Sequence, residues 1–350
     1  MRHRNIGSIG AACAIIVLLL SPIHLPIVSA ISSKPTVAPV IPATLSLNGF
    51  RISPVRSDLT IPAGTSQTVQ VSVLNLTPGS GIAQAEIDDF TAGNNENGVP
   101  DILLNGQSAP SHSLRSFVEP IKPFTIGASA SVEVNVTIKI PVGTPAGGYY
   151  GAIRILPYNP VTPGKGKNVA LSGSVASLFL VTVPGQIHEQ LSIASFDVRK
   201  LITKPYTFSG PGWLFENNKK LFAVVRFDNN GDLQEQPFGK IILEKGKTVI
   251  NSTQINASVP LGSVLPGSIR QFYEPLTGLG SFGKYTILGN FGYGSDGQLL
   301  SDNYSFYVVP LILFEIAGAV IFVLLFLIFI LPRLLRAYNR RVLRRSRRRW

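Results

Sequence analysis

The side chains that carry most enzyme chemistry are scarce in this sequence. It contains one cysteine, Cys13, and beyond residue 30 the only histidines are His112 and His188. Residues 278–283 match the letters of a dinucleotide-binding fingerprint, but strand-like residues follow where that site requires the start of a helix. We therefore expect a noncatalytic protein that uses no cofactor, with an enzyme of unknown type built around His112 or His188 as the alternative.

Metal ligation has one candidate, a stretch rich in acids and amides. Asp88 and Asp89 precede residues 93–101, where oxygen-bearing side chains surround a glycine turn, as in calcium loops. The first loop position is Gly93 instead of an acid, and amides replace most of the carboxylates. We expect a solvated surface loop and no metal site, with calcium binding as the alternative.

The basic charge of the chain lies at its two ends. Of the 31 lysines and arginines, two lie in the first 30 residues and nine in the last 18, which leaves 20 against 18 acids in the region between the two apolar ends. Because nine arginines of the C-terminal tail supply most of the net charge of +12, the sequence predicts no nucleic-acid partner.

The C-terminal tail, residues 332–350, combines arginines with apolar residues at helical spacing. Leu334, Leu335 and Tyr338 recur between the arginines, a pattern typical of an amphipathic helix on an anionic membrane surface. The alternative is a stop-transfer tail that only fixes topology. The predicted membrane-surface arginines are Arg333, Arg336, Arg340, Arg341, Arg344, Arg345, Arg347, Arg348 and Arg349.

The N-terminus has the form of a secretory signal peptide. Arg2 and Arg4 precede an apolar stretch, and small residues up to Ala30 suit cleavage there. We therefore expect a signal peptide at 1–30, followed by a Ser- and Pro-rich linker at 31–43, with an uncleaved anchor as the alternative.

Residues 308–331 predict a single transmembrane helix. They form an apolar run with one charge, Glu315, and as a helix would be ~36 Å long, enough for a ~30 Å hydrocarbon core. Tyr304, Phe306 and Tyr307 suggest an aromatic collar on the outer side. The arginine-rich tail then places the C-terminus in the cytoplasm and the N-terminal region outside a cell membrane. Glu315 either reaches the interface or has an intramembrane partner.

Between these ends, the apolar residues alternate with polar ones. Val69, Val71 and Val73 occupy every second position, and apolar residues do the same over 132–140 and 175–183. Turns that contain glycine or proline separate these runs. Alternation of this kind predicts antiparallel sheets with one buried face. We therefore expect an all-β fold of two immunoglobulin-like β-sandwich domains, at 44–187 and 188–307, followed by the transmembrane helix.

Short segments of this region resemble the WxL-interacting proteins, a family of membrane-anchored bacterial surface proteins. The matching segments are Ile52–Pro54, Pro62–Gly64, Val69–Asn75, Ile138–Pro141, Ala146–Ile153, Phe227–Gly231 and Pro237–Ile241. The resemblance implies a peptidoglycan-binding immunoglobulin-like domain, a second sandwich domain, one C-terminal helix and a basic tail.

The implied function is binding of cell-wall polymer or partner surface proteins through the sandwich domains. Tyr149, Tyr150 and Trp213 are then candidates for stacking against sugar rings, with core packing as the alternative. A second hypothesis is an extracytoplasmic assembly chaperone or scaffold that lends a strand edge to exported subunits.

Overall fold

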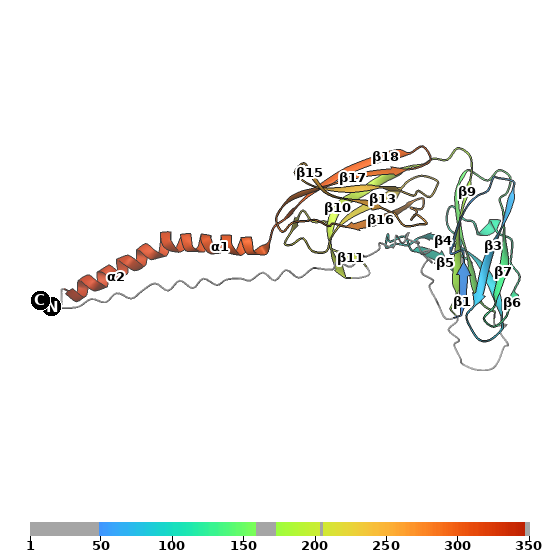
Figure 1. The fold of residues 1–350 in the computed structure, drawn as a ribbon, viewed down its shortest axis with the longest axis horizontal. Coiled ribbons are helices and arrows are strands. Elements are labelled where there is room, and N and C mark those ends of the chain that lie inside the picture. The colour runs from blue at the N-terminus through green and yellow to red at the C-terminus, as the bar shows by residue number, and fades with distance from the viewer. Residues whose placement is uncertain (1–48, 159–172, 204–205, 347–350) are drawn as a thin grey trace, which may run out of the picture. The chain divides into compact units, whose positions relative to one another are not determined.

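The computed structural model describes residues 49–158, 173–203 and 206–346 (Figure 1). The predicted signal peptide and linker lie outside the described residues, as do Arg347, Arg348 and Arg349. The prediction of a mostly β chain with one apolar C-terminal helix is confirmed.

The first half of the described chain forms two sheets. A three-stranded sheet has the order β1-β3-β7, and a larger sheet has the order β2-β9-β8-β4-β5, with β6 pairing with β4. The pairs are antiparallel except for β2 and β9, which run parallel. The elements are β1 (Phe50–Ser53), β2 (Arg56–Thr60), β3 (Ser66–Asn75), β4 (Gly81–Ala92), β5 (Pro100–Leu103), η1 (Arg115–Phe117), β6 (Phe124–Ile126), β7 (Ser131–Lys139), β8 (Gly147–Pro157) and β9 (Val175–Val183).

The second half forms a four-stranded sheet, β11-β10-β13-β16, and a five-stranded sheet, β12-β18-β17-β14-β15. A tight turn at residues 246–247 joins β14 and β15 into a hairpin. The strands are β10 (Leu191–Thr203), β11 (Thr207–Phe208), β12 (Leu214–Phe215), β13 (Leu221–Asn229), β14 (Phe238–Lys245), β15 (Thr248–Ile255), β16 (Ser268–Pro275), β17 (Gly283–Tyr293) and β18 (Gln298–Val308).

Each pair of sheets encloses a hydrophobic core. The first core draws its buried residues from 50–183 and the second from 191–308. The alternation predicts the buried face correctly: Val71 and Val73 of β3, for example, are fully buried. The residues that the structure describes nevertheless belong to one unit, so a domain boundary at 187/188 stays a prediction.

The C-terminal helix begins later and runs further than expected. Val308 belongs to β18 and lies fully buried in the second core, so the helical segment starts at α1 (Leu311–Leu325). Pro332, which has no backbone N–H, does not end the helical segment. A turn of π-helix, η2 (Phe326–Ile330), comes before it, and α2 (Leu331–Ser346) continues the segment. Residues 311–338 are long and apolar enough to cross a membrane, and none of them packs inside the protein.

The position of the helix start also bears on Glu315. Its backbone lies four residues, or ~6 Å, along the helix, so the carboxylate is close to one end of the apolar segment.

Candidate functional site

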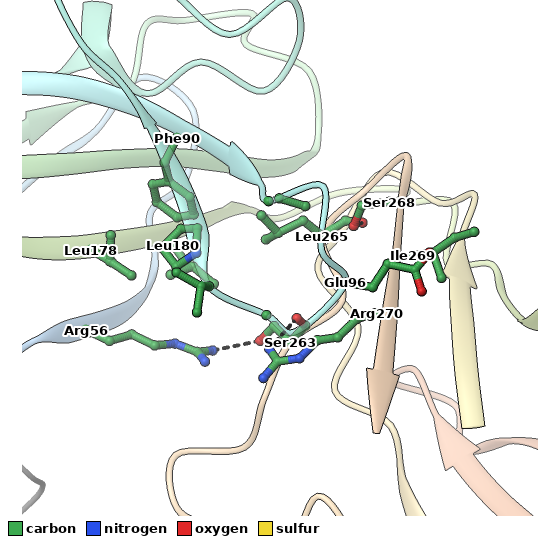
Figure 2. A pocket seen from close by; sticks show the side chains of 15 residues that line it. Arg56, Phe90, Glu96, Leu178, Leu180, Ser263, Leu265, Ser268, Ile269 and Arg270 are labelled. Atoms are coloured by element: carbon green, nitrogen blue, oxygen red, sulfur yellow. Dashed lines mark hydrogen bonds between the residues drawn. The ribbon is translucent and has the colours of Figure 1, made fainter. Parts of the chain in front are cut away.

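A cleft between the two pairs of sheets, in which polar groups converge beside an apolar wall, is the candidate site (Figure 2). Its apolar wall is a third, small cluster of Phe90, Tyr150, Ala152 and Leu180, with Leu178 and Leu265 packed against it. Leu178 and Leu180 point away from the first core because Phe179 between them points into it. Strand β9 is therefore buried on both faces, and the second face lines the cleft.

Arg56, at the start of β2, crosses the cleft. Its Nη1 donates to the carbonyl of Leu261 (2.9 Å) and its Nη2 to the Ser263 hydroxyl (2.9 Å), while Asp58 accepts from the same guanidinium at 2.6 Å. Figure 2 shows Arg56 and Arg270 approaching Ser263 from two sides. Arg56 therefore links the two halves of the chain and brings positive charge to the cleft.

Arg270 of β16 supplies the second guanidinium. Its Nη1 donates to the Ser263 carbonyl (2.9 Å) and its guanidinium carbon lies 5.1 Å from the centre of the Phe272 ring. Its Nε is buried and finds no hydrogen-bond partner among the described residues. Burial, with the charge of Arg56 adding to it, lowers the pKa of Arg270. An oxygen acceptor entering the cleft would supply the missing hydrogen bond and would compensate the buried positive charge.

The β4–β5 loop, residues 93–99, forms another wall of the cleft, and most of its residues are exposed, as the sequence predicts for a surface loop. Glu96 accepts two hydrogen bonds from the Arg226 guanidinium (2.6 and 2.5 Å), and its carbonyl accepts from the Gln271 N–H (2.8 Å). The Arg226 hydrogen bonds hold the pKa of Glu96 below its usual range. Asn95 and Asn97 accept from backbone N–H groups of the same loop.

The two acids before this loop also have protein partners. Asp88 accepts from Arg154 at 2.9 Å, and the buried Asp89 accepts from the N–H groups of Ala109, Leu114 and Arg115. Glu96 meanwhile faces the second half of the chain. These carboxylates are therefore occupied in separate contacts and do not converge on one point.

The Glu96–Arg226 pair makes a test of the contact between the two halves. We expect Glu96→Gln to lower the melting temperature at neutral pH, because the pair is a partly buried, two-point contact worth on the order of 1–3 kcal/mol. Since the folded-state pKa of Glu96 lies below 4.5, this stability is present above that pH and is lost as the pH falls below it. Thermal melting of both proteins across pH 3–7 should show the two curves converging in acid. A constant difference across that range would contradict this role.

Of the predicted glycan-stacking residues, Tyr149 and Tyr150 are adjacent and both rings lie near His112, whereas Trp213 lies in the second half of the chain. Tyr150 is buried and its hydroxyl donates to Gln234 at 2.8 Å, so it presents no ring to solvent, which corrects its assignment as an exposed aromatic. Tyr149 is half-buried, with its ring centre 5.3 Å from that of Phe117. Trp213 is exposed and lies beside β18, close to the start of the helix.

Near the cleft, one buried acid has incomplete hydrogen bonding. Glu235 accepts from the Gly294 N–H through Oε2 (3.0 Å), but Oε1 meets no donor in the part of the chain that the structure describes. Burial, with the negative charge of Glu189 adding to it, raises the pKa of Glu235 to about 7.

Sequence reasoning missed the two arginines of the cleft, because a lone arginine in a strand has no motif. One signal was available: Leu178-Phe179-Leu180-Val181 is a continuous apolar run, which indicates a strand buried on both faces. Of the tail arginines, Arg333 and Arg336 are exposed on α2, and Arg340, Arg341, Arg344 and Arg345 belong to the same helix.

No protein-family model matches the sequence, and a search of curated proteins finds no match. Among solved structures, the chain is similar to a chain of the chaperone–tip adhesin complex of CFA/I fimbriae, at 14% identity and a TM-score of 0.37 over 73% of this chain and 98% of that one. It is also similar to the class 5 fimbriae chaperone CfaA (14%, TM-score 0.35, 75% and 100%) and to a chain of the Salmonella enterica SafA pilin–SafB chaperone complex (13%, 0.32, 75% and 97%). Likeness this low carries no argument about what the present chain binds.

Proposed function

We propose that this chain is a noncatalytic, membrane-anchored surface protein that holds an extended segment of a partner protein in the cleft, as an assembly chaperone or scaffold for exported subunits. The observation that carries the proposal is the buried, unpartnered Nε of Arg270 beside an apolar wall. A carboxylate or carbonyl oxygen on the partner would accept from this N–H, close to the second guanidinium of Arg56.

The shape of the cleft suits a peptide. The cavity of about 70 Å³ at Arg270 lies next to a wider cleft of about 450 Å³, and Phe90, Glu96 and Leu265 line both. An apolar side chain would pack against Phe90 and Leu265 while the rest of the segment follows the wider part. Arginine provides the orientation, and apolar burial provides most of the affinity.

The proposed setting is the outer face of a cell membrane. Residues 311–338 would form a single span, the two immunoglobulin-like sandwiches would lie outside, and the arginine-rich tail would lie in the cytoplasm. Tethering would keep the cleft near the site where exported chains emerge.

The test is capture of exported clients by the full chain in lipid nanodiscs. Exported proteins from the source organism are unfolded in urea, diluted onto the nanodiscs, and the bound fraction is measured. We expect Arg270→Lys, which keeps the charge but removes the Nε–H, to weaken capture about tenfold or more. Arg51→Lys on the exposed edge of β1 is the matched control and should bind like the parent. Equal capture by all three proteins, with unchanged melting temperatures, would overturn the proposal.

Wall polymer is the second candidate ligand, from the resemblance to WxL-interacting proteins. The observation that favours it is a half-buried aromatic group in which the Tyr149 ring lies beside His112 and Phe117. Co-sedimentation of the same nanodiscs with cell wall stripped of its proteins separates the two candidates. Retention that is lost in Tyr149→Ala supports the polymer, whereas retention only on unstripped wall favours a protein partner.

A further inference from the structure

We propose that the end of the second sandwich from which the helix leaves is a membrane-docking face, with Trp213 seated among the lipid headgroups. The inference rests on the proposed membrane anchoring and adds a second contact with the same bilayer. We call this end the helix-side pole: residues 200–203, 206–221, 244–249, 274–284 and 307–310.

The pairing of the strands defines this pole. Gly283 pairs with Val308, Lys200 with Leu221, and Lys245 with Thr248, so the corresponding strand ends of both sheets lie on one side. The β10–β13 connection, the β14–β15 hairpin and the segment before β17 all emerge there. Because Val308 is only three residues before the helix, this is the side that must face a membrane crossed by that helix.

Trp213 is held close to the point where the chain would enter the bilayer. Its carbonyl accepts from the Tyr307 N–H at 2.7 Å, and its ring meets the Tyr307 ring edge-on with centres 6.4 Å apart. Tyr307 is four residues before Leu311, so even a fully extended chain puts at most ~14 Å between this contact and the helix start. Trp213 is 64% exposed, which is unfavourable in water and typical of tryptophan at a membrane interface.

Other apolar side chains at this pole are exposed in the same way. They are Ile202, Tyr206, Leu214, Phe282 and Tyr307, which are 39–60% exposed. The predicted aromatic collar is corrected in part here: Phe306 is fully buried against Phe215 and Tyr285, because alternate residues of β18 face the core. The interfacial aromatic groups therefore come mainly from loops remote in sequence from the helix.

The charge of the pole matches an anionic surface. Its lysines are Lys200, Lys219, Lys220, Lys245, Lys247 and Lys284, and its acids are Glu216, Glu244 and Glu274. At the opposite pole, residues 186–190, 229–238, 255–268 and 293–298 contain acids but no lysine or arginine. Lysine and exposed aromatic residues together on one side favour a lipid headgroup layer over a sugar polymer as the contact of Trp213.

The sequence contains two tryptophans, so Trp350→Phe leaves Trp213 as the sole tryptophan. This full-length variant is placed in nanodiscs of phosphatidylcholine and phosphatidylglycerol whose acyl chains carry bromine near the headgroups. We expect Trp213 to lose more than half of its emission relative to unbrominated nanodiscs, and to be protected from aqueous iodide.

The matched control moves the reporter to the opposite pole. The control variant combines Phe238→Trp with Trp213→Phe and Trp350→Phe. Phe238 starts β14 and is 53% exposed. We expect the emission of this tryptophan to be unchanged by the brominated lipid and to be quenched by aqueous iodide. If Trp213 behaves like the control in protein that co-elutes with nanodiscs, docking is wrong although the anchor holds. If the protein does not enter nanodiscs at all, both the anchor and the docking face are wrong.

Discussion

Glu235→Gln should make the protein more stable than its parent at pH 8 and leave the two equally stable near pH 4. Burial raises the folded-state pKa of Glu235 to about 7 from 4.5, so the folded state holds a proton that the unfolded state releases between these values. The stability that this proton contributes is therefore fully present below pH 4.5 and is lost as the pH rises through about 7. The loss is on the order of 2–4 kcal/mol, and a glutamine, neutral at every pH, avoids it.

The measurement is the melting temperature of the full chain in detergent from pH 4 to pH 8. A glutamine oxygen can still accept from the Gly294 N–H, so the variant keeps the one hydrogen bond that Glu235 makes. Asp296→Asn removes an exposed carboxylate from the adjacent turn and should leave the pH profile unchanged. A parent whose stability does not fall between pH 5 and pH 8 would show that Glu235 ionises normally in the folded state.

Asp89→Ala should cost more stability than any other substitution considered for this chain. The carboxylate is fully buried and accepts from three backbone N–H groups, those of Ala109, Leu114 and Arg115, at 2.9–3.1 Å. Alanine removes this acceptor from all three N–H groups, although the Leu114 N–H keeps the Tyr150 carbonyl at 3.3 Å. Each N–H left without an acceptor costs about 1–3 kcal/mol, so the loss is a large part of the net stability of an ordinary domain and we expect a markedly lower melting temperature.

Asp89→Asn tests the same hydrogen bonds with less loss. Its single oxygen can serve two of the three donors, while its NH₂ group faces the third, so an intermediate melting temperature is expected. Asp101→Asn on the exposed part of β5 provides the control for loss of one charge in the neighbouring strand. A melting temperature for Asp89→Ala within one degree of the parent would mean that the loop reorganises around solvent instead.

The sequence predicts elements where one side chain in two faces a core. Val71 and Val136 alternate with polar neighbours, and both are buried as expected. The start of the helix was misplaced because Val308 is apolar for a different reason, its place in the second core. Composition alone does not separate a buried strand end from the first turn of a membrane helix.

The candidate site could not be predicted in the same way. Glu96 and Arg226 are 130 residues apart, and Arg56 meets Ser263 across 207 residues. Contacts of this range depend on how two separate cores pack, which no local pattern encodes. The sequence marks Trp213 only as an aromatic residue. Its location beside Tyr307 comes from the short parallel pairing of β12 with β18, which the apolar periodicity does not predict.

The joint between β18 and the helix has a mechanical consequence. When a partner pulls on the protein and the helix resists, tension enters β18 at its C-terminal end and acts along the strand. Strand β18 pairs with β17 along its whole length, from Val308 opposite Gly283 to Gln298 opposite Tyr293. Because the load runs along this ladder, its hydrogen bonds are strained together in shear instead of opening one by one. The protein should therefore yield first elsewhere, and in the proposed function its attachment to the membrane would outlast its hold on a bound segment.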